Sequence, residues 1–165
     1  MRAILALGSN LGDRERTIRD AVAEIAALPQ VSLGAVSALV ETLALTPHGV
    51  DAAEPAYLNA VVSVETSLSP AELLARLNEI ELRHGRLREV RWGNRTLDID
   101  IVTMDGLRLE SDTVSLPHPR AAERSFVLVP WLEIEPDAEL PGIGRIDGLP
   151  AAREVVPRYL SEDIS

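Results

Sequence analysis

Residues 97–102 read LDIDIV, and this short stretch decides the fold prediction. Because side chains two apart in a strand share one face, Leu97, Ile99 and Ile101 point one way, toward helices, and the two aspartates point the other way. The backbone positions of Asp98 and Asp100 are then roughly 6.5–7 Å apart. The pattern predicts a half-buried strand with a pair of carboxylates on its outer face.

A pair of carboxylates at this spacing suits one hard cation, or two cations bound side by side. Positive charge lies just upstream, where five arginines fall within thirteen residues: Arg83, Arg86, Arg88, Arg91 and Arg95. Magnesium takes one or two carboxylates together with phosphate oxygens and water, so the combination predicts a nucleotide-phosphate site. The alternative is a solvent-facing strand beside a solvated loop whose arginines are balanced by Glu79, Glu81 and Glu89.

The rest of the chain alternates strand and helix patterns. Strands are predicted at 2–8, 31–42, 57–66 and 97–102, and helices at 13–28 and from 69 to a stop near Gly85. Asp13 is the expected N-cap of the first helix, and Ser69, Pro70 and Glu72 form a capping box for the second. A long loop at 43–56, an arginine-rich loop at 86–96 and a turn at 105–106 separate these elements, and a small strand and a short helix are expected near the end.

This order predicts an α+β fold, a ferredoxin-like βαββαβ sandwich with an antiparallel sheet, helices packed on one face and a C-terminal extension. A doubly wound sheet is the alternative reading. The connection from 31–42 to 57–66 carries no helical pattern, which favours antiparallel neighbours. We expect a single domain over residues 1–165.

Composition excludes several classes of function. The chain has no cysteine, so it has no disulfide, thiolate nucleophile or zinc–thiolate site. Its formal net charge of −10 argues against general nucleic-acid binding. No apolar run is long enough to span a bilayer, and the N-terminal stretch lacks the pattern of a secretory signal, so a cytoplasmic protein is expected.

Common phosphate-binding motifs are missing. All sixteen cationic side chains are arginines, and without lysine no Walker motif or protein-kinase lysine can exist. The stretch LGSNLG at 7–12 does not match the dinucleotide-binding pattern. His118 lies between two prolines and near Arg120 and Arg124, which fits a phosphate or base contact as well as it fits a turn histidine without a function.

Five segments together make the chain resemble the 6-hydroxymethyl-7,8-dihydropterin pyrophosphokinases of folate biosynthesis. The segments are ALGSNLGD at 6–13, YLNAVV at 57–62, EIELRHGRLR at 79–88, RWGNRTLDIDIV at 91–102 and LPHPRAAERSFVLVP at 116–130. The resemblance implies a ferredoxin-like core and a monomer that needs magnesium. It also implies transfer of pyrophosphate from ATP to the pterin hydroxymethyl group, with release of AMP.

The resemblance also implies roles for particular residues. Asp98 and Asp100 would hold two Mg²⁺ ions that bridge the ATP phosphates, with Arg86 and Arg95 gripping those phosphates. The implied nucleotide contacts are Asn78, Glu81, His118 and Arg124, and the implied pterin pocket holds Tyr57, Asn59, Trp92 and Phe126. Read without the family, Tyr57 is a strand-end residue and Phe126 a core residue.

Two features depart from the family pattern. Asn94 stands where the family usually has a proline or a small residue, so the arginine-rich loop is expected to be more flexible here. The loop before YLN is longer than usual, so either Thr42 or Thr46 with Pro47 fills the pterin-contacting position. Both long loops are expected to close over the substrates and exclude water.

Two other functions fit parts of the sequence. A nucleotidyl transferase with the same acidic pair would attack the α-phosphorus and release pyrophosphate. A small-molecule sensor domain would carry the aspartates as mere surface residues, but it leaves the arginine cluster unexplained.

Overall fold

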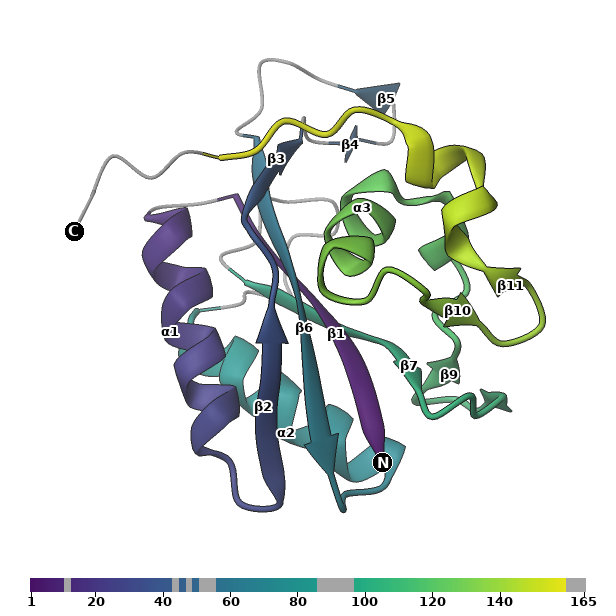
Figure 1. Cartoon of the computed structure of the whole chain (residues 1–165). Coiled ribbons are helices and arrows are strands. Elements are labelled where there is room, and N and C mark those ends of the chain that lie inside the picture. Colours follow the sequence, from purple (N-terminus) through teal and green to yellow (C-terminus); the bar gives the residue numbers. More distant parts are fainter. Residues whose placement is uncertain (11–12, 43–44, 47–48, 51–55, 86–96, 160–165) are drawn as a thin grey trace.

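The structure is a computed structural model, which describes residues 1–10, 13–42, 45–46, 49–50, 56–85 and 97–159 (Figure 1). The central sheet contains β1 (Arg2–Ser9), β2 (Val31–Val36), β3 (Val40–Thr42), β6 (Tyr57–Thr66) and β7 (Asp98–Met104). The helices are α1 (Arg14–Ala27), α2 (Pro70–Arg83) and α3 (Ser125–Ile134). Short strand pairs join β4 (Leu45–Thr46) to β5 (Gly49–Val50), β8 (Leu109–Glu110) to β9 (Ser115–Leu116) and β10 (Glu139–Leu140) to β11 (Gly144–Arg145). Single 3₁₀ turns span Ala121–Glu123, Ile146–Gly148 and Pro150–Arg153.

The predicted α+β fold with an antiparallel sheet is confirmed. The strand order is β2-β6-β1-β7, with β3 also paired to β6, and every pairing in the sheet is antiparallel. This is the order of a ferredoxin-like sheet, in which the first and third core strands are central. The doubly wound alternative is therefore wrong.

The helix starts are set by the predicted caps. The Asp13 side chain accepts a hydrogen bond from the Arg16 backbone N–H at 3.2 Å, and Ser69 Oγ accepts from the Glu72 N–H at the same distance. Pro70 occupies the first turn of α2, where its missing N–H costs nothing.

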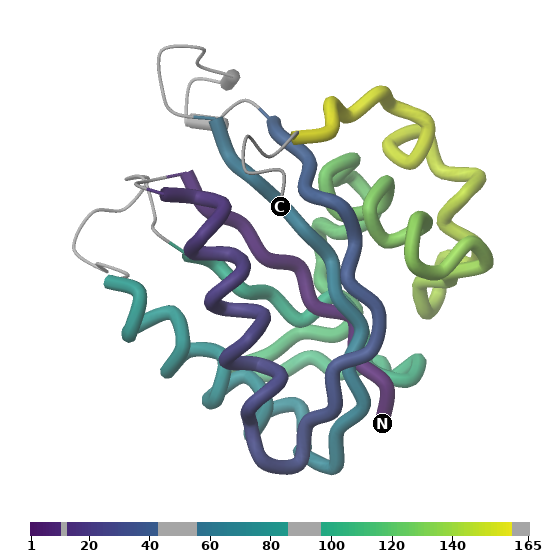
Figure 2. The backbone as a smooth tube through the Cα atoms, turned by 60° about the vertical axis from the view of Figure 1, so that its left-hand side comes forward, coloured from purple at the N-terminus to yellow at the C-terminus, as the bar shows by residue number. Residues whose placement is uncertain are grey.

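One face of the sheet is covered by α1 and α2 (Figure 2). Its core comes from alternate positions of the strands, including Leu5, Leu7, Leu58 and Ile99, against Leu77 and other helix residues. The predicted direction of the apolar residues of β7 is thus confirmed.

The opposite face is covered by α3 and the segment that follows it (Figures 1 and 2). Ile4 and Val61 of the sheet pack with Leu128 and Trp131 of α3. The expectation of helices on one face alone was therefore incomplete. This second layer matters for function, since Asp98 and Asp100 point to the same side as α3.

Two local predictions need correction. Residues 31–42 form two strands, because the pairing with β6 is interrupted after Val36, where Ser37 bonds Val61 through both its N–H and its hydroxyl. The helix α3 was not predicted. Its apolar sequence SFVLVPWLEI shows no amphipathic period and contains Pro130, which removes one N–H from the interior of the helix.

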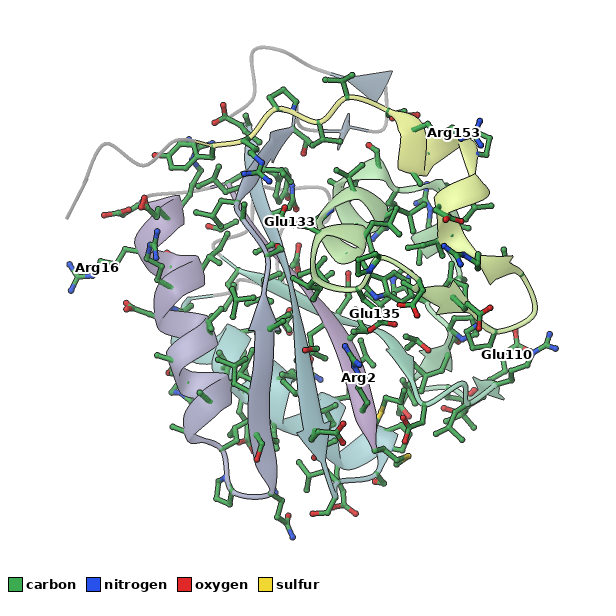
Figure 3. All side chains as sticks on the ribbon, in the orientation of Figure 1. Arg2, Arg16, Glu110, Glu133, Glu135 and Arg153 are labelled. Atoms are coloured by element: carbon green, nitrogen blue, oxygen red, sulfur yellow. The ribbon has the colours of Figure 1, made fainter. Side chains whose placement is uncertain are left out.

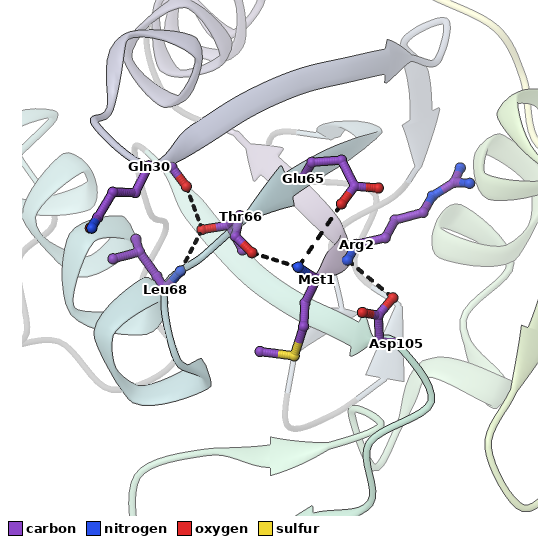
Figure 4. Close-up of polar contacts among 7 residues, drawn as sticks. All are labelled: Met1, Arg2, Gln30, Glu65, Thr66, Leu68 and Asp105. Atoms are coloured by element: carbon purple, nitrogen blue, oxygen red, sulfur yellow. Dashed lines mark hydrogen bonds and ion pairs between the residues drawn. The ribbon is translucent and has the colours of Figure 1, made fainter.

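At the start of β1, Met1 and Arg2 make polar contacts with residues at the ends of neighbouring strands (Figure 4). The Met1 ammonium group donates to the Thr66 carbonyl at 2.6 Å, and the Arg2 N–H donates to Asp105 Oδ1 at 3.0 Å. The Thr66 hydroxyl in turn donates to the Gln30 carbonyl at 2.8 Å. These bonds tie β1 to the ends of β6 and β7.

Candidate functional site

Gly8, near the end of the central strand β1, lies between two polar residues of the neighbouring strands. It is paired with Asn59 of β6 on one side and with Asp98 of β7 on the other. Directly paired residues of a sheet put their side chains on the same face. The amide and the carboxylate therefore flank a position that has no side chain.

Two residues earlier in β1, on the same face of the sheet, Ala6 lies between Val61 of β6 and Asp100 of β7. The small residues on β1 leave a cavity of about 190 Å³ under α3. The side chains and backbone that line it come from β1, β3, β6, β7 and the start of α3: Ala6, Leu7, Gly8, Thr42, Tyr57, Asn59, Asp98, Asp100, Arg124, Phe126 and Val127.

One end of the cavity carries the amide and two aromatic residues. Asn59 is 6% exposed, and its Nδ2 donates a hydrogen bond to Thr42 Oγ1 at 3.1 Å. This bond directs the NH₂ group of the amide toward Thr42. The amide oxygen, Oδ1, therefore lies on the side of Gly8. Tyr57 and Phe126 also line this cavity, so four predicted pterin contacts, Thr42 among them, come together.

The side of the cavity formed by β7 is charged. Asp100 Oδ2 lies 3.7 Å from Arg124 Nη1 and 3.9 Å from His118 Nε2. Arg124 also lies over the Phe126 ring, with 5.7 Å between its Cζ and the ring centroid. The guanidinium is thus held near both an aromatic ring and a carboxylate of the cavity.

His118 is held by its backbone and by one ring nitrogen. Its N–H donates to the Val102 carbonyl of β7 at 2.8 Å, and its Nδ1 accepts from the Arg120 N–H at 3.2 Å. The neutral ring therefore carries its proton on Nε2, which faces Asp100. Burial lowers the pKa of His118 below its ordinary value; Asp100 acts in the opposite direction, and Arg124 and Arg120 lower it further.

Glu81 takes a different position from the other predicted nucleotide contacts. It is 2% exposed at the end of α2, and its Oε2 accepts a hydrogen bond from the Ile99 N–H at 2.9 Å. Ile99 is the residue between the two aspartates, so Glu81 holds the strand that carries them. Neither Glu81 nor Asn78 lines the cavity, and their nucleotide contact stays a prediction.

Several predicted site residues lie outside the described residues: Arg86, Trp92 and Arg95, together with Asn94 and Pro47. The backbone of Thr46 belongs to β4. Thr42, one of the two threonine alternatives, lines the cavity and is hydrogen-bonded to Asn59.

The donor set fits magnesium. Asp98 and Asp100 present carboxylates on one face of β7, and Mg²⁺ commonly takes one or two carboxylates while phosphate and water complete its shell. Within the described parts of the chain, no group of three or more His, Cys, Asp or Glu side chains is arranged to hold a metal ion. An ion held by these two carboxylates would need phosphate oxygens and water as further ligands.

Comparison with known proteins identifies the family. The sequence profile of the 7,8-dihydro-6-hydroxymethylpterin-pyrophosphokinases (HPPK) matches residues 4–136. The chain belongs to the HPPK family. The matched stretch contains every residue that lines the cavity.

Curated relatives agree with this assignment. The chain is 45% identical over 132 residues to the 2-amino-4-hydroxy-6-hydroxymethyldihydropteridine pyrophosphokinase of Bacillus subtilis, covering 80% of this chain and 77% of the relative. It is 42% identical over 141 residues to the protein of the same name from Methylorubrum extorquens, covering 86% and 87%.

Solved structures support the fold. A crystal structure of HPPK-DHPS in complex with substrates superposes with a TM-score of 0.65 at 15% identity, over 88% of this chain and 42% of that chain. The wild-type HPPK-DHPS of Plasmodium falciparum with pteroate gives a TM-score of 0.62 at 16% identity, over 88% and 41%. The HPPK chain described here thus spans less than half of those two-part chains, and they show its fold alone.

Sequence reasoning missed the small residues that create the cavity. Ala6 and Gly8 belong to a segment that carried the family resemblance, yet no role was predicted for either. A signal was present, because a glycine and an alanine two positions apart in a central strand leave space on one face only.

Replacing Gly8 with alanine tests the origin of the cavity. An added Cβ would lie 2.9 Å from Asn59 Oδ1 and 3.6 Å from Tyr57 Cδ1, so the amide must move. We expect Gly8→Ala to weaken binding of a pterin by about tenfold, the worth of one good hydrogen bond, with ATP affinity unchanged. Gly148→Ala is the control, because a Cβ there meets nothing within 4 Å. Equal pterin affinity in both variants, measured by calorimetry, would contradict the assignment.

Replacing Glu81 tests its support of the acidic strand. Glu81→Leu removes the acceptor of the buried Ile99 N–H and should lower the free energy of unfolding by about 1–3 kcal/mol. Glu81→Gln keeps an acceptor oxygen and should lose less. Urea denaturation of both variants gives the comparison, and a leucine variant as stable as the glutamine variant would refute the supporting role.

Proposed function

We propose that this protein transfers the pyrophosphoryl group of ATP to the hydroxymethyl group of 6-hydroxymethyl-7,8-dihydropterin, giving AMP and the pterin diphosphate in folate biosynthesis. The row Asn59–Gly8–Asp98 is the observation that carries the proposal. It places two groups in one cavity: an amide that can hydrogen-bond the polar edge of a pterin ring, and a carboxylate that can hold a metal ion at the phosphates.

The size and lining of the cavity support a pterin acceptor. A volume of about 190 Å³ lies below the range usual for drug-sized ligands, and it suits one flat bicyclic ring better than a nucleotide. Tyr57 and Phe126 supply aromatic faces, and Asn59 supplies the polar contact that orients the ring. The hydroxymethyl group then points toward the aspartates.

The nucleotide would lie on the charged side of the cavity. Asp98 and Asp100 would hold Mg²⁺, with two ions expected from the family pattern, and bound magnesium neutralises the charge that builds up on the phosphates. His118 and Arg124 can donate to phosphate oxygens from this side. Arg86 and Arg95 are predicted to add further guanidinium donors.

The reaction is a single in-line displacement. The pterin hydroxyl oxygen attacks the β-phosphorus of ATP, the bond from that phosphorus to the α,β-bridging oxygen breaks, and AMP leaves with that oxygen. The hydroxyl proton passes to solvent or to a carboxylate of the site. The residues of the site act by positioning the two substrates and by stabilising negative charge on the transferred group.

The protein is proposed to act alone, as a cytoplasmic monomer that binds neither nucleic acid nor membrane. The formal net charge of −10 supports the absence of nucleic-acid binding. Among the described helices, none has the length and apolar character needed to cross a bilayer.

The products formed from ATP, Mg²⁺ and 6-hydroxymethyl-7,8-dihydropterin test the function directly. Phosphorus NMR should show AMP and a pterin diphosphate appearing in equal amounts. Pyrophosphate with a nucleotidylated acceptor would instead identify a nucleotidyl transferase. A folded protein that shows no turnover and no magnesium-dependent ATP binding would identify a sensor domain.

Conversion of either aspartate to asparagine tests the metal site. Asp98→Asn and Asp100→Asn keep the shape of the side chain but remove the charge, and we expect kcat/KM to fall by about 100-fold or more. Asp112→Asn, at an exposed position away from the cavity, is the matched control and should behave like the unaltered protein. Near-normal activity of Asp98→Asn or Asp100→Asn would exclude these carboxylates as metal ligands.

A further inference from the structure

The segment that follows the last 3₁₀ turn, residues 154–159, lies along the outer edge of β3, and its yellow trace runs past that strand in Figure 1. We call this segment the strap. The Glu41 N–H donates to the Pro157 carbonyl at 2.9 Å. The Tyr159 N–H donates to the Leu39 carbonyl at the same distance. The strand β3 is therefore held on both sides, by β6 and by the strap.

The end of β3 is the part that serves the cavity. The strand has only three residues, and its last pair with β6 is Thr42–Tyr57. Both residues line the cavity, and Thr42 accepts the hydrogen bond that orients the Asn59 amide. Because the terminal pair of a short strand opens more easily than the middle of a sheet, contacts from outside the pair decide how firmly it is held.

Such contacts come from Arg14, the first residue of α1. Its Nη1 donates to the Ala56 carbonyl at 2.7 Å and lies 2.8 Å from Glu41 Oε2. Ala56 and Glu41 directly precede the two members of the last pair, so one nitrogen atom joins both strands at this point.

The strap completes the surroundings of the Arg14 guanidinium. The Arg14 Cζ lies over the Tyr159 ring, 5.7 Å from its centroid, and the ring also packs against the main hydrophobic core. A planar guanidinium can bind two acceptors and stack on a ring at the same time, which a lysine ammonium cannot do. The family profile matches residues 4–136, so Tyr159 lies beyond the matched stretch.

The position of Arg14 in α1 gives a second argument. The N-terminus of a helix carries partial positive charge, so a cation at its first residue is unfavourable for the helix. Arg16 and Arg19 pair with acidic residues of α1 itself, whereas Arg14 reaches other elements. The contacts of Arg14 therefore stabilise the strands and the strap rather than its own helix.

We propose that Arg14 and the strap residue Tyr159 form a clamp for the pterin end of the cavity. The clamp positions the Thr42–Tyr57 pair, and Thr42 in turn orients the Asn59 amide. Arg14 and Tyr159 are positioning residues, since neither lines the cavity. The role in acceptor binding rests on the proposed function, whereas the effect on Asn59 can be measured without any substrate.

The side-chain amide signal of Asn59 in a ¹H–¹⁵N spectrum reports on the clamp in the free protein, and Asn59→Asp assigns it. We expect Arg14→Gln to shift this signal and to speed exchange of its protons with water by about fivefold, because the bond to Thr42 is open more often. Arg16→Gln is the matched control and should change neither. It lies on the same helix, its side chain is 78% exposed, and Figure 3 shows it pointing away from the molecule.

Steady-state kinetics of the full-length variants measure the consequence for the reaction. Arg14→Gln should raise the KM for the pterin by about tenfold and leave kcat and the KM for ATP within about twofold. A loss of folded protein would instead lower kcat and leave both KM values unchanged. Arg14→Lys keeps the charge without the planar fork, so it should not restore the KM for the pterin.

A double-mutant cycle tests whether the two residues act together. Tyr159→Leu keeps an apolar side chain against the core but removes the ring, and it should raise the KM for the pterin by about two- to fivefold. In the Arg14→Gln background the same substitution should have no further effect, since the contact is already lost.

Three results would overturn the proposal. The first is an Asn59 signal that is the same in Arg14→Gln and Arg16→Gln. The second is a KM for the pterin that Arg14→Lys restores fully, which would assign the effect to charge alone. The third is additive effects of Arg14→Gln and Tyr159→Leu.

Failure of the clamp and failure of the proposed function give different results. An unaltered protein that forms no AMP from ATP and the pterin would refute the proposed function and the role of the clamp in acceptor binding. The Asn59 signal would still show whether Arg14 positions the amide. Normal turnover with identical Asn59 signals in the Arg14 and Arg16 variants would refute the clamp alone.

Discussion

The architecture of the site depends on the pairing of β1 with strands on both sides. Because β1 is central, a single position on it fixes the distance between a residue of β6 and a residue of β7. At Gly8 this pairing brings the Asn59 amide and the Asp98 carboxylate to opposite sides of an empty position. The proposed recognition of the acceptor by Asn59 and the proposed phosphate site at Asp98 are thereby linked through the backbone pairing of the sheet.

Side-chain size along β1 decides where α3 touches the sheet. Ile4 fills the space against Trp131 and the neighbouring core, whereas Ala6 and Gly8 leave the space beneath Phe126 and Arg124 open. One helix can therefore anchor the second layer at one end and cover the proposed pterin cavity at the other. The two aspartates face this layer because β7 has the same alternation as β1.

The strands and first two helices could be predicted because each carries a local signal. The alternation in LDIDIV gave the correct faces of β7, and side-chain caps marked the starts of α1 and α2. The helix α3 carries no such signal, because it is apolar on nearly all sides and has an internal proline. It is stabilised by packing between the sheet and the C-terminal 3₁₀ turns, which only the tertiary structure supplies.

The candidate site was predictable in its parts but not in its layout. Asp98 and Asp100 follow from one strand, and Tyr57, Asn59 and Phe126 from family resemblance. That Asn59 and Asp98 flank the same glycine depends on the register of three strands, which no short sequence pattern encodes. Glu81 was assigned to the nucleotide, and only the structure shows it bound to the backbone between the aspartates.

The distance between Arg124 and Asp100 has a consequence for catalysis. At 3.7 Å the Nη1–Oδ2 contact is an ion pair that is too long for a hydrogen bond, so Asp100 does not use up the donors of the guanidinium. The cation–π contact with Phe126 instead holds the guanidinium at the cavity that both residues line. In the proposed phosphate contact, Arg124 would therefore donate without first breaking a strong bond to the aspartate. Among the described residues, Arg124 is thus positioned by contact with an aromatic ring and by attraction to a carboxylate, which suits the proposed binding of a highly charged nucleotide by an acidic protein.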